Sequence, residues 1–239
     1  MKHLLIITIL FPVLLFGQNK TDGKGQKQGA WEVKFEDSDI VRYRGQFKDN
    51  KPYGKFEYYY PNGKLSAVSK FDLGGIVVRT TMFDIEGSPM GYGKYINQQK
   101  DSTWTYFQNN QVISKEDYKN GERHGKKTVF YDDGQVYEEY HFANNLEEGQ
   151  WKMYYPNGNI KITCNYVNGN RNGQITYYYN DGQQETVGFY KNAVKNGFWR
   201  YYDIRGRVSK EVFYKNDKII LEGQDIKEEL DQLKAEGKI

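Results

Sequence analysis

The sequence predicts an all-β protein: an elongated single-sheet meander of about eight β-hairpin repeats with a short C-terminal capping helix. Three observations predict this fold. The 239-residue chain is rich in Tyr (22), Phe (13) and Gly (25), and aromatic residues favour strands whereas Gly favours turns. The same spacing of aromatic and Gly residues recurs roughly every 24 residues along most of the chain. Helical spacing appears only after Ile220.

The repeat becomes visible when segments are aligned on a Gly or an equivalent position. Successive starts lie 24 residues apart, with one step of 23 and one of 25. Each unit has a bulky residue at offset two, an aromatic pair at offsets five and six, a Gly at offset nine and an aromatic residue at offset seventeen. Eight units therefore form an array over residues 29–220. Their starts are Gly29, Gly54, Val78, Ser102, Gly125, Gly149, Gly173 and Gly197.

Each unit has the turn residues of a β-hairpin. In Tyr155-Pro156-Asn157-Gly158 the Pro fixes a negative φ and the Gly accepts the positive φ that closes a bulged hairpin. A second turn at Asn168-Gly169 passes the chain to the next unit. A lone hairpin is barely stable, so we expect neighbouring hairpins to pair edge to edge. About sixteen strands at roughly 4.8 Å each would extend about 75 Å.

Side-chain alternation along the strands separates two faces. Offsets two, four and six, such as Trp151, Met153 and Tyr155, together with Ile162 and Cys164 of the second strand, are expected to form a packed face. The opposite face carries an aromatic stripe at offset five. This stripe either stacks for structural reasons or binds a ligand, and both interpretations stay open. The candidate binding residues are Tyr59, Phe130, Tyr154, Tyr178 and Tyr202.

The N-terminal segment has the composition of an export signal. Lys2 precedes an apolar run from Leu4 to Phe16, which is too short to cross a bilayer core of about 30 Å. We expect residues 1–17 to be a signal peptide and residues 18–28 a flexible leader. Because Gln18 stands where a lipid-bearing Cys would be needed, the expected address is the periplasm, cell envelope or extracellular space, without a lipid anchor. The alternative is a buried N-terminal strand of a cytosolic protein.

The C-terminal segment, residues 221–239, is expected to form an amphipathic helix. Asp225-Ile226-Lys227-Glu228 has the form of a capping box, and Leu230 and Leu233 follow Ile226 at helical spacing. Such a helix, laid over the last hairpin, would cover an open edge strand, as repeat arrays require.

These residues carry a family resemblance. The stretches 118–125 (Tyr-Lys-Asn-Gly-Glu-Arg-His-Gly) and 166–173 (Tyr-Val-Asn-Gly-Asn-Arg-Asn-Gly) resemble MORN repeats. The whole unit, with its Trp and paired Tyr, is similar to the MORN-repeat variant of bacterial proteins often labelled antitoxins, over roughly 29–219. The pattern departs at Val78 and Ser102, where the leading Gly is missing, and at Glu36–Asp39 in place of the first turn. The resemblance implies a scaffold that binds proteins or sometimes lipids, without shared catalytic residues.

No constellation of catalytic residues is found in the sequence. His124 and His141 lack metal-ligand companions at useful spacing, and Cys164 falls on the apolar face, where a buried inert thiol is expected. We therefore expect no enzyme activity, no cofactor and no metal. The formal net charge of +3 is too small for a nucleic-acid binder.

The leading hypothesis is an exported, non-catalytic repeat scaffold that binds a protein partner, with an immunity or antitoxin-like role as its specific form. One alternative is a cell-wall or glycan-binding module whose aromatic residues cage a quaternary ammonium group. Another is peripheral membrane binding through aromatic residues flanked by Lys55, Lys126, Lys152 and Arg200. Loss of Lys2 with the signal would lower the formal net charge of +3 to about +2, which makes attraction to anionic lipid weak.

Overall fold

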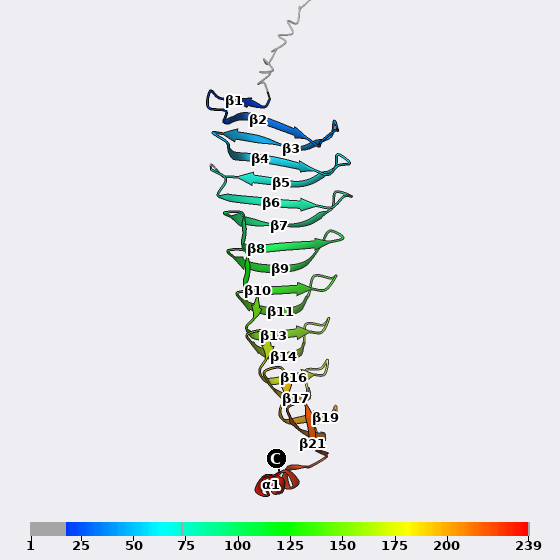
Figure 1. Cartoon of the computed structure of the whole chain (residues 1–239). Coiled ribbons are helices and arrows are strands. Elements are labelled where there is room, and N and C mark those ends of the chain that lie inside the picture. The colour runs from blue at the N-terminus through cyan, green and yellow to red at the C-terminus, as the bar shows by residue number, and fades with distance from the viewer. Residues whose placement is uncertain (1–17, 73, 239) are drawn as a thin grey trace, which may run out of the picture.

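The computed structural model describes residues 18–72 and 74–238, so the expected signal peptide at 1–17 lies outside the described residues. These residues form one open antiparallel sheet of 21 strands in meander order, followed by one helix, α1. In Figure 1 the strands stack along a single axis, from β1 at one end to α1 at the other. The predicted all-β, elongated single-sheet meander is confirmed.

The strands of the sheet have the following bounds: β1 Lys20–Thr21, β2 Lys27–Lys34, β3 Val41–Lys48, β4 Lys51–Tyr59, β5 Leu65–Phe71, β6 Val77–Phe83, β7 Pro89–Ile96, β8 Gln99–Gln108, β9 Gln111–Lys119, β10 Glu122–Phe130, β11 Val136–Ala143, β12 Leu146–Glu147, β13 Gly149–Tyr154, β14 Ile160–Val167, β15 Asn170–Arg171, β16 Gly173–Tyr178, β17 Gln184–Lys191, β18 Val194–Lys195, β19 Gly197–Tyr202, β20 Val208–Lys215 and β21 Lys218–Gly223. Helix α1 spans Lys227–Ala235.

The eight expected hairpins are present: β2–β3, β4–β5, β6–β7, β8–β9, β10–β11, β13–β14, β16–β17 and β19–β20. In the sixth, the Tyr155 N–H donates to the Asn159 carbonyl at 2.8 Å, and Gly158 has the positive φ of 85° that the turn requires. Neighbouring hairpins pair through their edges, as β11 with β13 and β14 with β16.

A β-bulge recurs in every hairpin between offsets four and five. The register shifts between Met153 and Tyr154 in β13 and between Tyr177 and Tyr178 in β16, and the other six hairpins shift at the equivalent position. A bulge bends the strand and changes the direction of the side chain beside it. The extra residue lies in the second strand of each hairpin, such as Lys161 in β14 and Glu185 in β17. The residue at offset five, which is aromatic in seven of the eight hairpins, therefore lies opposite the bulge.

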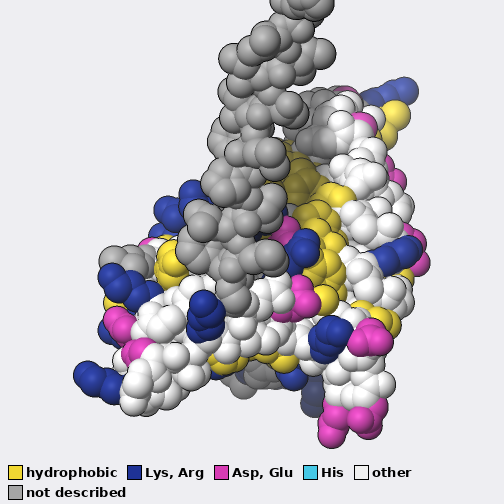
Figure 2. All heavy atoms as spheres, turned by 90° about the horizontal axis from the view of Figure 1, so that it is seen from above, with side chains coloured by type: hydrophobic (Ala, Val, Ile, Leu, Met, Phe, Trp, Pro, Cys, Tyr) yellow, Lys and Arg dark blue, Asp and Glu magenta, His cyan; other side chains and the backbone are white. Residues whose placement is uncertain are grey.

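The core is a seam of side chains that runs along the packed face, across the strands. Trp151, Ile175 and Trp199 at offset two lie opposite Cys164, Gly188 and Val212 of neighbouring strands, and their buried cluster includes Ile162. Trp104 and Ile175 of the packed face are both 0% exposed, so these side chains are fully buried. Figure 2 looks along the ribbon and shows hydrophobic side chains inside the bend of the sheet and charged ones at its rim.

Three strand glycines make room for the large rings of this seam. A Cβ added at Gly45, Gly93 or Gly188 would overlap the ring of Phe56, Trp104 or Trp199, respectively. Each ring therefore lies flat against the backbone of the neighbouring strand. The packing of one hairpin on the next depends on these close approaches.

The expectation of a flexible leader at 18–28 is wrong. Strand β1 pairs with β2, with Lys20 opposite Gln28, and the Asp22 carboxylate accepts hydrogen bonds from the Lys24 and Gln26 N–H groups at 2.8 and 2.9 Å. The Asn19 side chain binds the backbone of Glu32 at both N–H and carbonyl. The segment thus forms a small hairpin that pairs with the first edge of the array.

The C-terminal segment is corrected in two respects. The sheet continues to Gly223 in β21, and the helix covers only Lys227–Ala235 of the expected 221–239. The expected capping box does not form, because Ile226 occupies the N-cap and no side chain caps the helix. Ile226 and Leu230 are 3% and 0% exposed, so apolar packing fixes where the helix begins. Lys234 lies 5.5 Å from the Phe213 ring, which places α1 beside β20.

Candidate binding surface

The structure places the five stripe residues at the ends of the first strands of their hairpins, opposite the bulge of the second strand, and all five are half-buried. Three of them contact charged residues on the outer face, which is the face opposite the packed face. The Arg44 guanidinium lies 5.4 Å from the Tyr59 ring and Lys115 lies 5.8 Å from the Phe130 ring. The Tyr154 hydroxyl donates to the Glu139 carboxylate at 2.9 Å. The stripe thus lies on the outer face among charged neighbours.

The stripe residues are not stacked on one another. Within the described part of the chain, no aromatic contact joins two of the five, and the ring pairs are found mainly on the packed face, such as Tyr190 with Trp199 at 5.3 Å. Phe130, Tyr154, Tyr178 and Tyr202 belong to successive hairpins, so their backbones lie two strand spacings apart, roughly 9–10 Å, and Tyr59 lies farther away. That distance exceeds the 4.5–7 Å at which rings interact. The rings of the stripe therefore do not stack on one another, and each contacts other groups.

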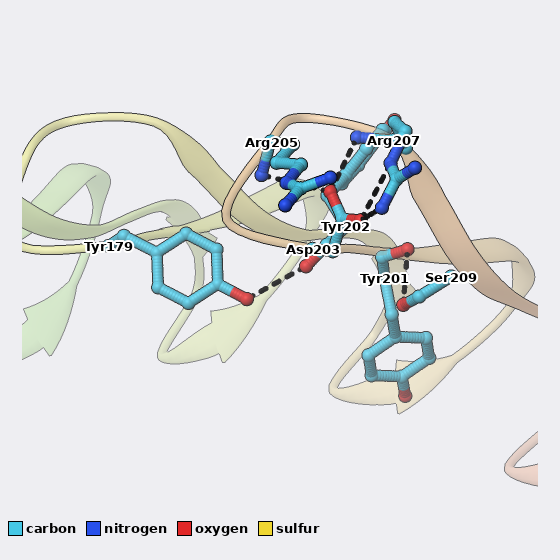
Figure 3. Close-up of polar contacts among 7 residues, drawn as sticks. All are labelled: Tyr179, Tyr201, Tyr202, Asp203, Arg205, Arg207 and Ser209. Carbon is cyan, nitrogen blue, oxygen red and sulfur yellow. Dashed lines mark hydrogen bonds and ion pairs between the residues drawn. The ribbon is translucent and has the colours of Figure 1, made fainter.

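The tyrosine at offset six, the second residue of the aromatic pair, fixes the backbone at offset five of the next hairpin. The Tyr179 hydroxyl donates to the Tyr202 carbonyl at 2.8 Å, as Figure 3 shows beside the turn that Asp203 closes. The same bond joins Tyr155 to Tyr178 at 2.7 Å, and two further units repeat it, from Tyr60 to Phe83 and from Tyr131 to Tyr154. Each tyrosine at offset six thereby links its hairpin by a hydrogen bond to the backbone at offset five of the next hairpin.

Charges close to the stripe are partly paired. Lys126 binds Glu139 at 2.5 Å beside Tyr154, and burial followed by the hydrogen bond to Glu139 raises the pKa of Tyr154 to about 12. Burial alone would raise the pKa of Glu139, but Lys126 and Tyr154 lower it overall. Both groups therefore keep their neutral Tyr and anionic Glu forms at neutral pH. At this position the stripe presents a neutral phenol, not a phenolate.

At the N-terminal end of the stripe, Glu57 carries the strongest local charge effect. Hydrogen bonds from Lys55 at 2.6 Å and Arg44 at 2.5 Å lower the pKa of Glu57 to about 2. The Tyr59 hydroxyl also donates to this carboxylate at 2.9 Å. A single acid thus holds two cations and one stripe residue in place.

On the packed face, the rings already have cationic partners from the same chain. Two residues before the start of a unit, a Lys or Arg reaches over the aromatic residues of the seam: Lys27 over Trp31 at 4.5 Å, Lys100 over Trp104 at 4.6 Å, Arg123 over Phe142 at 4.4 Å, Arg171 over Trp151 at 5.4 Å and Lys195 over Trp199 at 4.4 Å. Each contact is a cation–π interaction worth about 0.5–1 kcal/mol at an exposed site. The cations cover ring faces that a ligand would otherwise reach.

The sequence did not predict the cations that cover the seam rings or the hydrogen bonds of the offset-six tyrosines. A cation at offset minus two is visible in the sequence in five of the eight units, but its partner ring depends on how the hairpins pair. One unit replaces the seam pair altogether: Lys127 stands at the Trp position and Glu116 faces it at 3.1 Å. The repeat pattern alone gives no signal for that ion pair.

The residues considered for chemistry have structural surroundings. Cys164 is 2% exposed in the seam, and burial raises the pKa of its thiol, which disfavours the reactive thiolate. His124 is exposed, and His141 Nδ1 lies 3.2 Å from the Gln150 carbonyl oxygen. Over 18–72 and 74–238, no three His, Cys, Asp or Glu side chains are grouped so as to hold a metal ion. In the same residues no helix has the length and apolar character needed to cross a membrane.

Two solved structures match this chain at low sequence identity and with TM-scores too low to indicate a shared fold. A variant of S. aureus TarM in complex with Fondaparinux, alpha-GlcNAc-glycerol and UDP is 13% identical, with 49% of this chain and 21% of that chain covered and a TM-score of 0.32. A second TarM structure is 14% identical, with 59% and 20% covered and a TM-score of 0.20. The chain thus spans about a fifth of the length of these structures. No curated protein matches the chain.

The model of the MORN repeat variant family matches three stretches, residues 52–72, 123–144 and 147–168. These stretches fall on the second, fifth and sixth hairpins, in phase with the 24-residue repeat. The remaining five hairpins share the register shift between offsets four and five. Three of the eight hairpins thus match the MORN repeat variant model, and the chain has the architecture of a repeat scaffold.

Proposed function

We propose that this protein is an exported, non-catalytic scaffold that binds a protein partner through its outer face, with immunity-type inhibition of an envelope-acting toxin as its specific role. The observation that carries the proposal is the stripe of half-buried aromatic residues, which occupies the same offset in five of the eight hairpins beside charged side chains. Aromatic residues surrounded by polar groups are typical anchors of protein interfaces. Repeat arrays use such extended surfaces for binding.

The filled packed face supports assignment of binding to the outer face. Seam rings such as Trp104 and Trp199 are almost fully buried, and Lys100 and Lys195 cover them. A quaternary ammonium ligand of the kind bound by aromatic cages would have to displace these cations. This arrangement favours a protein partner over the glycan-binding alternative.

Export is proposed from the sequence of residues 1–17. Its charged start and apolar run of about 13 residues have the form of a secretory signal. A partner would then be met in the periplasm, in the cell envelope or outside the cell. Inhibition of a cytosolic toxin does not fit this address.

The proposal is tested by a pull-down from envelope extract with the chain beginning at Gln18 as bait. We expect one protein to be captured stoichiometrically and to be lost when Tyr154→Ser, Tyr178→Ser and Tyr202→Ser are combined. The matched control combines Val167→Ser, Ile204→Ser and Ile219→Ser, three exposed apolar residues outside the stripe, with 42%, 70% and 54% exposure. Circular dichroism verifies that both triple variants stay folded.

Capture by the control but not by the stripe variant supports the proposal. Equal capture by wild type and a folded stripe variant would place the contact elsewhere. No capture from extract, combined with co-sedimentation with purified wall polymer or with anionic liposomes at low salt, would replace the protein partner by one of the two alternative ligands.

A further inference from the structure

A row of four cationic residues crosses four adjacent strands on the outer face. Lys55 of β4 lies directly opposite Lys70 of β5, Lys70 opposite Arg79 of β6, and Arg79 opposite Lys94 of β7. Residues directly opposite in an antiparallel pair have Cβ atoms about 4.5–5.5 Å apart, and like charges so placed destabilise the pair. The fold therefore keeps four positively charged side chains next to one another, which is electrostatically unfavourable.

Internal ion pairs relieve only the two ends of this row. Lys55 binds Glu57 at 2.6 Å, and Lys94 lies 3.4 Å from Asp101. Within the described residues, Lys70 and Arg79 have no carboxylate within ion-pair distance, and both side chains are exposed. The centre of the row thus carries two adjacent cations without an anion.

At the equivalent positions of later hairpins the one Lys or Arg is Lys126, which faces His141 and is paired with Glu139. The next hairpin places Thr103 opposite Asp117, with a hydrogen bond of 2.7 Å between them. Gln150 then faces Asn165, and Phe198 faces Phe213. The charge is therefore a local feature of β4 to β7 and does not follow from the repeat.

The cationic row borders a shallow concavity of about 410 Å³ on the same face. Lys70, Arg79 and Lys94 line it together with Val68 and Tyr92. Tyr92 is 47% exposed, and its ring lies 5.8 Å from that of Phe107. The site thus combines free positive charge with an exposed ring and an aliphatic side chain.

We infer that this concavity docks an acidic helix of the protein partner, laid along the ribbon with carboxylates on successive turns; the inference rests on the proposed function. Strands are spaced about 4.8 Å apart and helix turns about 5.4 Å, so over three intervals the mismatch reaches only about 2 Å. Same-side residues of an extended chain are about 6.7 Å apart, and the mismatch would reach about 6 Å. Tyr92 and Val68 contact the apolar residues beside the acidic stripe.

A broad anionic surface fits this site less well. The formal net charge of the chain is only +3, and two outer-face cations outside the row, Lys126 and Arg200, are paired with Glu139 and Glu211. A membrane or a long nucleic acid would meet this neutral remainder of the ribbon. A short acidic segment meets only the four cations.

The experiment uses two synthetic peptides of identical composition, each about 20 residues long in an Ala/Gln host so that helix can form. One carries its Glu residues on a single helix face at intervals of three and four, and the other distributes them around the helix. Binding to the chain beginning at Gln18 is measured by calorimetry at low salt. The variant Lys70→Gln with Arg79→Gln is compared with Lys191→Gln with Lys215→Gln, which removes the same charge from exposed strand-end residues.

We expect the single-face peptide to bind more tightly than the distributed one, and Lys70→Gln with Arg79→Gln to weaken it about tenfold while the control variant changes it less than about twofold. Equal binding of the two peptides, equal weakening by both variants, or tighter binding of phosphatidylglycerol vesicles or polyphosphate at this row would overturn the inference. If the pull-down still captures a partner with Lys70→Gln and Arg79→Gln present, the inference fails and the proposed function stands.

Discussion

The tyrosine at offset six is the clearest example of a residue whose role is set by the next unit. Its hydroxyl satisfies a backbone carbonyl 23 residues later, as from Tyr179 to Tyr202 at 2.8 Å. Tyr179→Phe removes that donor alone, and we expect the free energy of unfolding in urea to fall by about 0.5–1.5 kcal/mol. Tyr178→Phe is the matched control, expected to change stability by less than about 0.5 kcal/mol. Equal changes in the free energy of unfolding for the two variants would contradict a stabilising role of the hydrogen bond from Tyr179 to Tyr202.

Glu57 makes a prediction about pH at the same scale. Its pKa is lowered from 4.5 to about 2 by Lys55 and Arg44, so its stabilising contribution is present above about pH 4.5 and is lost as pH falls toward 2. Glu57→Gln should therefore lose less stability than wild type between pH 5 and pH 2.5, as measured by thermal unfolding across this range. Glu86→Gln, an exposed turn residue, should follow the wild-type profile. Parallel profiles for wild type and Glu57→Gln would contradict this assignment.

At the scale of the element, the packing of hairpin on hairpin depends on strand glycines beneath large rings. Ala is normally preferred to Gly within a strand, but Gly188→Ala would drive a methyl group into Trp199. We expect this substitution to cost about 1–3 kcal/mol in the free energy of unfolding. In a Trp199→Leu background the ring is gone, so the added cost of Gly188→Ala should nearly vanish in a double-mutant cycle. Additive effects would show that the ring does not lie on this glycine.

The elements also show how far the sequence could predict the structure. The hairpins and turns follow from local residues, such as Pro156 and Gly158, and the period sets their pairing. The packed seam follows from alternation, as Ile162 and Cys164 confirm. The cation over Trp199 and the N-cap of α1 at Ile226 depend on packing between elements, which local patterns do not encode. The strand in the leader was missed because Lys20–Thr21 has no apolar period.

At the scale of the whole molecule, the ribbon presents two faces of different character. The packed face buries its rings against glycines and covers them with its own cations. The outer face changes along its length, from the cationic row at β4 to β7, through amides, to aromatic residues near α1. A repeat scaffold with one uniform face and one varied face can hold a partner in a single register, because only one segment of the partner matches each chemistry.

The central claim is that the partner lies on the outer face, and neighbouring residues of β16 test it most directly. Tyr177 packs against the seam, whereas Tyr178 belongs to the outer stripe. With the photoreactive residue p-benzoylphenylalanine placed at either position, illumination of the full complex should crosslink the partner from position 178 and not from 177. Crosslinking from 177 alone, or with equal yield from both positions, would contradict the account.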